Sequence, residues 1–211
     1  MGVPVLVLGE SGAGKSYSLR NFDPADVLVL NVANKLLPFK KKLRVINGAN
    51  YDVIGKELQK QEFHTYVIED SQYLLVFDLF DKANQNGYEK FTKMAVRFER
   101  MLNYIIMQMP EDTIVYLLHH SIRGDDGVQR AKTVGKMLDT YLSLEGLVSI
   151  CLYTENSNGK HYFVTQSDGT TTAKSPEGMF ELEIENDLKA VDSRIREYYG
   201  MEVPHEEVES V

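Results

Sequence analysis

Eight residues near the N-terminus carry the most specific chemistry in this sequence. Residues 9–16 read Gly-Glu-Ser-Gly-Ala-Gly-Lys-Ser, which fits G-x-x-x-x-G-K-[ST], and they follow the apolar run 3–8 without a break. Glycines in such a loop let successive backbone N–H groups point at phosphate oxygens. Lys15 is expected to reach the β- and γ-phosphates, and Ser16 is expected to offer its hydroxyl to Mg²⁺. The pattern therefore predicts a P-loop that binds ATP and Mg²⁺.

The predicted nucleotide contacts extend over the whole loop and one residue beyond it. A helix predicted over 15–21 would add its positive N-terminal end to the site. The alternative is a glycine-rich turn that binds nothing. In that case an unpaired lysine inside the loop would cost free energy for no evident reason. The predicted contact residues are Gly9, Glu10, Ser11, Gly12, Ala13, Gly14, Lys15, Ser16 and Tyr17.

Two acids follow the short apolar strand predicted over 65–68. Glu69 and Asp70 match the Walker B pattern, in which a carboxylate at a strand tip holds Mg²⁺ through water. We expect Asp70 to take the metal role, with capping of the next helix as its alternative. Side chains alternate along a strand, so Glu69 would then point to the opposite side of the sheet. Glu69 is nevertheless the candidate nearest in sequence for orienting the attacking water.

Two histidines follow the apolar strand predicted over 113–118. P-loop proteins commonly place a polar residue at this point, where it senses the γ-phosphate, so His119 and His120 are both candidates. Only one of the two can face the site, because neighbouring side chains on a strand alternate. A purely structural histidine is the alternative for each.

Composition and charge narrow the possible classes of protein. The chain has 211 residues, of which 43% are hydrophobic, and we expect one domain over 1–200 followed by an acidic, flexible tail over 201–211. Cys151 is the single cysteine, which excludes an internal disulfide. No apolar run approaches the roughly 20 residues of a membrane span, and we expect a cytoplasmic protein without membrane contact.

The net charge of -8 is opposite to that of a protein dominated by phosphate contacts. Any nucleic-acid surface must therefore be local. Two basic clusters are candidates, with a solvated face as the alternative for each. They are Lys40, Lys41, Lys42 with Arg44, and Arg123, Arg130, Lys132 with Lys136.

Strands and helices alternate along most of the chain, which predicts an α/β fold with a mostly parallel sheet flanked by helices. A further strand is predicted over 27–32, and helices over 51–61 and from Ser71 to Pro110, with a break at 86–87. Asn158-Gly159 lies between apolar segments 148–154 and 162–166 and predicts an antiparallel hairpin edge. A last helix is predicted over 186–199, closed by Gly200.

The order of P-loop, Walker B acids and polar strand tip, followed by a hairpin edge, resembles the RecA-like P-loop NTPase core. Nearly the whole chain is similar to a family of small phage AAA-type ATP-binding proteins related to Sak-type single-strand annealing proteins. The segments that carry the resemblance are 31–35 (NVANK), 69–73 (EDSQY), 118–121 (LHHS), 132–139 (KTVGKMLD) and 172–178 (TAKSPEG).

This resemblance implies an ATP-dependent protein of phage recombination or replication that forms rings or filaments with ATP at subunit boundaries. It also implies that the loop 121–136 contacts single-stranded DNA through Arg123, Arg130 and Lys132, with phosphate as the attraction. Its glycines and acids at 124–127 suit a mobile loop. Lys136 or Lys174 would then neutralise γ-phosphate charge across a subunit boundary, with a solvated surface lysine as the alternative for each.

One departure from the family concerns hydrolysis. The catalytic glutamate of that family stands at the end of the second strand, where residues 31–34 of this chain contain no acid. Hydrolysis is therefore either slow or dependent on Glu69 or a neighbouring subunit.

Three functions remain open from the sequence: an ATPase acting on single-stranded DNA, a nucleotide-gated scaffold with little hydrolysis, and a small-molecule phosphotransferase. The third needs an arginine-bearing lid, for which loop 121–136 is poorly suited.

Overall fold

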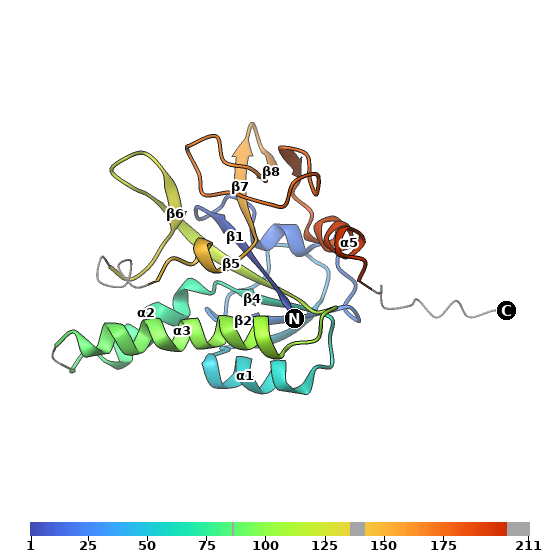
Figure 1. Ribbon diagram of the computed structural model, residues 1–211. Coiled ribbons are helices and arrows are strands. Elements are labelled where there is room, and N and C mark those ends of the chain that lie inside the picture. The colour runs from blue at the N-terminus through green and yellow to red at the C-terminus, as the bar shows by residue number, and fades with distance from the viewer. Residues whose placement is uncertain (86, 136–141, 202–211) are drawn as a thin grey trace.

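A mostly parallel β-sheet runs through the centre of the molecule and is covered by helices on both faces (Figure 1). The computed structural model describes residues 1–85, 87–135 and 142–201. The strands are β1 (Val3–Gly9), β2 (Val27–Asn31), β3 (Arg44–Asn47), β4 (Thr65–Glu69), β5 (Ile114–Arg123), β6 (Gln129–Ala131), β7 (Ile150–Ser157), β8 (Lys160–Val164) and β9 (Glu183–Glu185). The helices are α1 (Tyr51–Lys60), α2 (Gln72–Asp81), α3 (Glu89–Gln108) and α5 (Leu188–Tyr199), with single 3-10 turns η1 (Ser16–Leu19) and η2 (Glu145–Leu147).

In the sheet, a single strand, β5, separates β1 and β4, the strands that lead into the two predicted phosphate-site motifs. Along the sheet the order is β3-β2-β4-β5-β1-β7-β8-β9, and β6 pairs with the far end of β5. The pairs from β3 to β7 are parallel, whereas β7-β8, β8-β9 and β5-β6 are antiparallel. The α/β class, the mostly parallel sheet and the antiparallel edge are thereby confirmed.

Alternating side chains of the strands divide the core into two layers. On β1, Leu6 and Leu8 pack with helices α1, α2 and α3, and Val5 and Val7 pack with η1 and α5. The apolar stripe expected on the long helix is buried in the first layer, where Phe98 and Ile105 are fully covered. Strands that are apolar on both faces are typical of parallel sheets.

Several local signals in the sequence are confirmed. The Asn50 side chain accepts hydrogen bonds from the backbone N–H groups of Asp52 and Val53 and so caps α1. Gly200 ends α5 in the left-handed conformation, with φ +63°. Asn158 and Gly159 also have positive φ and turn β7 into β8.

Three predicted boundaries are wrong. The helix expected over 15–21 is the single turn η1, so its dipole contributes little to the preceding loop 9–15. Strand β5 continues past Leu118 to Arg123, because the chain turns at 124–127 and pairs back through β6. Helix α5 begins at Leu188, where Asp187 rather than Asn186 supplies the capping carboxylate.

None of the helices among the described residues has the length and apolar character needed to cross a bilayer. The acidic segment after Met201 lies outside the described residues.

Candidate phosphate-binding site

The loop after β1 curls around a buried lysine. Gly12 and Gly14 have φ of +81° and +111°, values that favour glycine. The Lys15 ammonium group donates hydrogen bonds to the carbonyl oxygens of Gly9 and Glu10, at 2.7 and 2.9 Å. Burial lowers the pKa of Lys15 to about 8. The loop thus holds a cation at its centre in the conformation that its glycines allow.

Ser16 is joined directly to the acid at the end of β4. Its hydroxyl donates a hydrogen bond to Oε1 of Glu69, a side chain that is only 5% exposed. Burial raises the pKa of Glu69 to about 7, although the hydrogen bond from Ser16 and the charge of Lys15 oppose that rise. The other carboxylate oxygen, Oε2, is buried and has no hydrogen-bond partner.

The expectation that strand alternation would turn Glu69 away from the P-loop is wrong. On β4, Thr65 contacts α5 and Val67 packs in the layer of η1 and α5. Glu69 is the next alternate residue, so it continues on that face and meets Ser16. Alternation along β4 therefore places Glu69 beside Ser16, once it is known which face of the sheet carries η1.

Asp70 also lies at this site, because the backbone changes direction after β4. Its φ is +57°, in the left-handed region that non-glycine residues seldom adopt. Its carboxylate is 2.7 Å from the Lys35 ammonium nitrogen and 3.2 Å from Nε2 of His120. Burial alone would raise the pKa of Asp70, but hydrogen bonds from His120 and Lys35 outweigh burial and lower it.

Together these side chains line one cavity of about 360 Å³. Its polar end contains both carboxylates with Lys15, Ser16 and His120. The other lining residues include Ser11, Gly12, Gly14 and Tyr17 of the loop, residues 35–38 and His161. The structure thus brings most of the predicted contact residues to one cavity.

The two histidines of β5 point to opposite faces of the sheet. His120 lines the cavity, whereas His119 is fully buried on the α3 side, where its ring meets that of Phe98. Nε2 of His119 donates to the carbonyl oxygen of Lys132 at 2.8 Å, and Nδ1 lies 2.9 Å from the Ser71 hydroxyl. Burial lowers the pKa of His119 to about 4. The structure thus places His120 at the cavity and gives His119 a structural setting.

Sequence reasoning did not single out Lys35 as a site residue. The side-chain amide of Asn31, at the end of β2, donates hydrogen bonds to the Lys35 carbonyl oxygen at 2.6 Å and to Asn47 at 2.9 Å. This contact holds the loop after β2 so that the Lys35 ammonium group reaches Asp70 and lies 4.8 Å from the centre of the Tyr73 ring. In the sequence, the polar residue Asn31 at the end of a predicted strand was the signal that the loop carrying Lys35 is held near the site.

His161 was also missed. It lies on β8, and its Nδ1 is 2.6 Å from the carbonyl oxygen of Ala13 in the glycine-rich loop after β1. A Cβ atom at Gly14 would lie 2.7 Å from the His161 ring, so this contact requires glycine at position 14. No spacing in the sequence connects two residues that lie so far apart along the chain.

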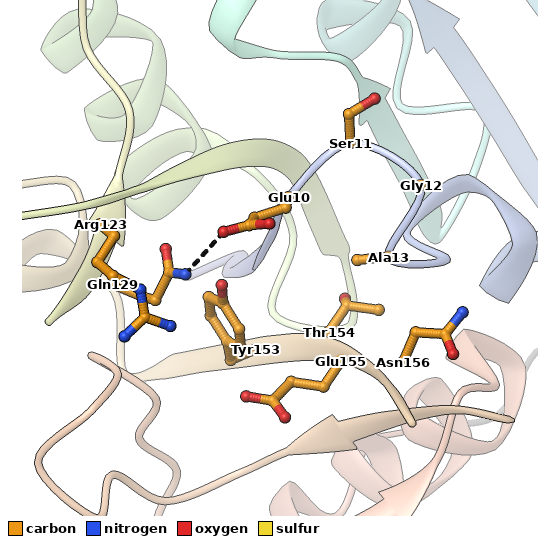
Figure 2. Close-up of a pocket in the computed structure, with 10 residues that line it drawn as sticks. All are labelled: Glu10, Ser11, Gly12, Ala13, Arg123, Gln129, Tyr153, Thr154, Glu155 and Asn156. Atoms are coloured by element: carbon orange, nitrogen blue, oxygen red, sulfur yellow. Dashed lines mark hydrogen bonds between the residues drawn. The ribbon is translucent and has the colours of Figure 1, made fainter. Parts of the chain in front are cut away.

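A second cavity, of about 350 Å³, is lined in part by residues 10–13 of the same loop (Figure 2). There the Gln129 side-chain amide donates a hydrogen bond to the Glu10 carboxylate at 2.9 Å, which joins the P-loop to β6. Tyr153 and Thr154 of β7 form another wall. The predicted loop contact Glu10 thus faces this cavity as well.

The predicted DNA-binding side chains lie on or beside the β5–β6 hairpin, not on an open loop. Arg123 donates to the Gly127 carbonyl oxygen at 2.9 Å, and Arg130 pairs with Asp126 at 2.6 Å. Lys132 is exposed just after β6. The turn that was expected to be mobile is closed by a backbone hydrogen bond from Gly127 to Gly124.

The two candidate lysines for contact across a subunit boundary are placed differently. Lys174 pairs through its backbone with Cys151 of β7, and its side chain is not among those that line the P-loop cavity. Lys136 lies outside the described residues.

Neither a comparison with models of known protein families nor a search of curated proteins finds a match for this chain.

Proposed function

We propose that this protein binds Mg²⁺ and a nucleoside triphosphate at the P-loop cavity, as a RecA-like P-loop ATPase. The observation that carries the proposal is the Ser16–Glu69 contact, which joins the motif hydroxyl to a buried acid at a strand tip. Oε2 of Glu69 is buried without a hydrogen-bond partner, and a hard cation is a fitting partner for such an oxygen. Lys15 supplies the positive charge for phosphate beside it.

Ser16 and Glu69 are the residues that would hold the metal, which would neutralise phosphate charge. Lys15 would bind the β- and γ-phosphates after exchanging its two carbonyl partners for phosphate oxygens. Lys35 and His120 bring further donors to the same end of the cavity. In this arrangement Glu69 takes the metal role that the sequence favoured for Asp70.

Asp70 is then the acid available to orient water, and His120 holds its carboxylate from β5. Hydrolysis would not need an acid at the end of β2, where Asn31 instead positions Lys35.

A second candidate function, the nucleotide-gated scaffold, is favoured by a specific contact. Asp70 already has Lys35 and His120 as partners, and an acid held by two donors is a weak base for water.

Single-stranded DNA is the proposed partner of the ATPase, in keeping with the resemblance to phage annealing and recombination proteins. The β5–β6 hairpin supports this proposal, because it extends beyond the sheet and carries Arg123 and Arg130 (Figure 1). Gln129, which pairs with Arg123 beside the turn of the hairpin, joins the hairpin to Glu10 of the loop 9–16. Self-association into a ring or filament is part of the same proposal.

The test is ATP binding and turnover with the full chain, measured with Mg²⁺ and with or without single-stranded DNA. The ATPase predicts Mg²⁺-dependent binding and a turnover that DNA increases. The scaffold predicts binding and ATP-dependent assembly with almost no turnover. Absence of binding to the wild-type chain, or equal binding by a Lys15→Ala variant, would remove the P-loop from both functions.

A further inference from the structure

We infer that Tyr17 and His161 form the nucleobase end of the P-loop cavity and make the site selective for purine nucleoside triphosphates over inorganic polyphosphate, with little choice between adenine and guanine. This inference rests on the proposed function. It assigns a role to two cavity residues that the phosphate chemistry does not use. Both residues line the cavity together with Lys15 and Ser16.

The strand order gives the direction of a bound nucleotide. Glu69 ends β4 and His161 lies on β8, and in the sheet these strands are separated by β5, β1 and β7. The P-loop follows the middle one of these three, β1. With the terminal phosphates at the Glu69 side, the nucleoside must extend toward β8, where Tyr17 and His161 lie.

Both rings are fixed by other parts of the protein. His161 Nδ1 donates to the Ala13 carbonyl oxygen at 2.6 Å, and its ring centre is 5.8 Å from that of Tyr17. The guanidinium group of Arg20 lies 4.4 Å from the Tyr17 ring centre and is itself paired with Glu185 at 3.2 Å. Rings that are already positioned lose little conformational entropy when a base stacks on them.

Residues 36–38, which follow Lys35, add apolar side chains to the lining of the same cavity. Leu36 is 98% exposed, and Leu37 and Pro38 line the cavity beside it. A leucine that projects into solvent at the edge of a cavity gains by covering an apolar ligand surface. The cavity therefore offers a base apolar surface in addition to the two rings.

Stacking and apolar contact use the flat face that every base has, and they discriminate poorly between bases of equal size. A purine offers more surface than a pyrimidine. We therefore expect similar affinities for ATP and GTP, weaker binding of CTP, and the weakest binding of tripolyphosphate.

Calorimetric titrations of the full chain with these four ligands, all with Mg²⁺, test the inference. His161→Asn keeps an amide donor for the Ala13 carbonyl group but removes the ring, and Tyr17→Leu removes the other ring with little loss of apolar volume. Each variant should weaken ATP and GTP binding by about tenfold, within the range of base–aromatic stacking, and leave tripolyphosphate binding within about twofold. His64→Asn, at a half-exposed histidine paired with Asp112, is the matched control and should bind like the wild type.

Two results would overturn the inference while leaving the proposed function intact. One is a wild-type chain that binds tripolyphosphate as tightly as ATP. The other is an equal loss of ATP and tripolyphosphate binding in His161→Asn and Tyr17→Leu, because those residues would then act only through the shape of the P-loop. A wild-type chain that binds none of the four ligands would instead contradict the proposed function itself.

Discussion

The Ser16 hydroxyl donates a hydrogen bond to the carboxylate of Glu69, a residue 53 positions later in the sequence. Strand β5 lies between the strands that lead to these two residues, so the contact bridges across that strand. Asp70, the neighbouring acid, instead contacts Lys35 and His120. The two adjacent carboxylates are thus assigned to different partners by the fold.

The first prediction separates these two acids. Glu69→Gln keeps the shape of the side chain but removes the charge that a metal beside Ser16 would need, so Mg²⁺-dependent ATP affinity should fall by about tenfold or more, which is about 1.4 kcal/mol. Asp70→Asn should change that affinity less, because its partners are Lys35 and His120, and should lower turnover instead. Calorimetry with and without Mg²⁺ measures the difference. The opposite ranking would return the metal role to Asp70.

Local signals in the sequence were sufficient for much of the fold. Apolar runs predicted the buried strands, and Asn50, Asn158-Gly159 and Gly200 predicted a cap, a turn and a helix end. These signals work because each depends on residues that are close in sequence. The motif that contains Lys15 and Ser16 is a signal of the same local kind, and both residues line the cavity.

The partners of the site could not be found in this way, because they depend on which faces of the sheet carry which helices. Alternation along β4 and β5 was certain, but the choice of Glu69 and His120 for the cavity needed the position of η1. The left-handed conformation of Asp70 is not encoded by its residue type. His161 reaches Ala13 from β8, which is two strands away from β1 in the sheet.

The second prediction concerns Lys15. Lys15→Ala removes a charged donor for the phosphates and should weaken Mg²⁺-ATP binding by about 2–5 kcal/mol, as expected when one partner of a buried charge pair is truncated. Two carbonyl groups of the loop lose a hydrogen bond, but the variant also no longer buries an ammonium group, whose pKa is lowered to about 8 by that burial. These two effects oppose each other, so the thermal midpoint of the variant should stay close to that of the wild type. Circular dichroism checks the fold, and calorimetry checks the affinity. Unchanged ATP affinity would contradict the central proposal.

The third prediction is a dependence of stability on pH that comes from His119. Its pKa is about 4 in the folded protein and about 6.5 in an unfolded chain. Below pH 6.5 the unfolded chain therefore binds a proton that the folded protein does not, and stability from this group is lost as the pH falls from 6.5 toward 4. Between pH 7 and pH 5 the loss should be about 2 kcal/mol.

A His119→Leu variant tests this contribution by urea unfolding at both pH values. The variant should be less stable than the wild type at pH 7, because the Lys132 carbonyl group loses its partner. The difference should shrink by about 2 kcal/mol at pH 5, because the variant has no ring to protonate. Phe98→Leu alters the packing against the same ring without removing a titratable group, and its destabilisation should change much less with pH. An equal cost of His119→Leu at both pH values would contradict the prediction.

The last prediction locates the DNA contact. The chain is acidic overall, so affinity for single-stranded DNA must come from a few local cations. Replacement of Arg123, Arg130 and Lys132 by glutamine should flatten the log–log salt dependence of binding by roughly two units, at about 0.7 per phosphate contact. ATP binding should be retained, because none of the three lines the P-loop cavity.

The matched control replaces Lys40, Lys41 and Lys42 by glutamine, which removes the same number of positive charges. If this control loses the salt dependence and the hairpin variant does not, DNA binds at 40–44. If neither variant changes DNA binding, the scaffold becomes the better account of the protein, because an ATPase acting on DNA needs one of these two surfaces.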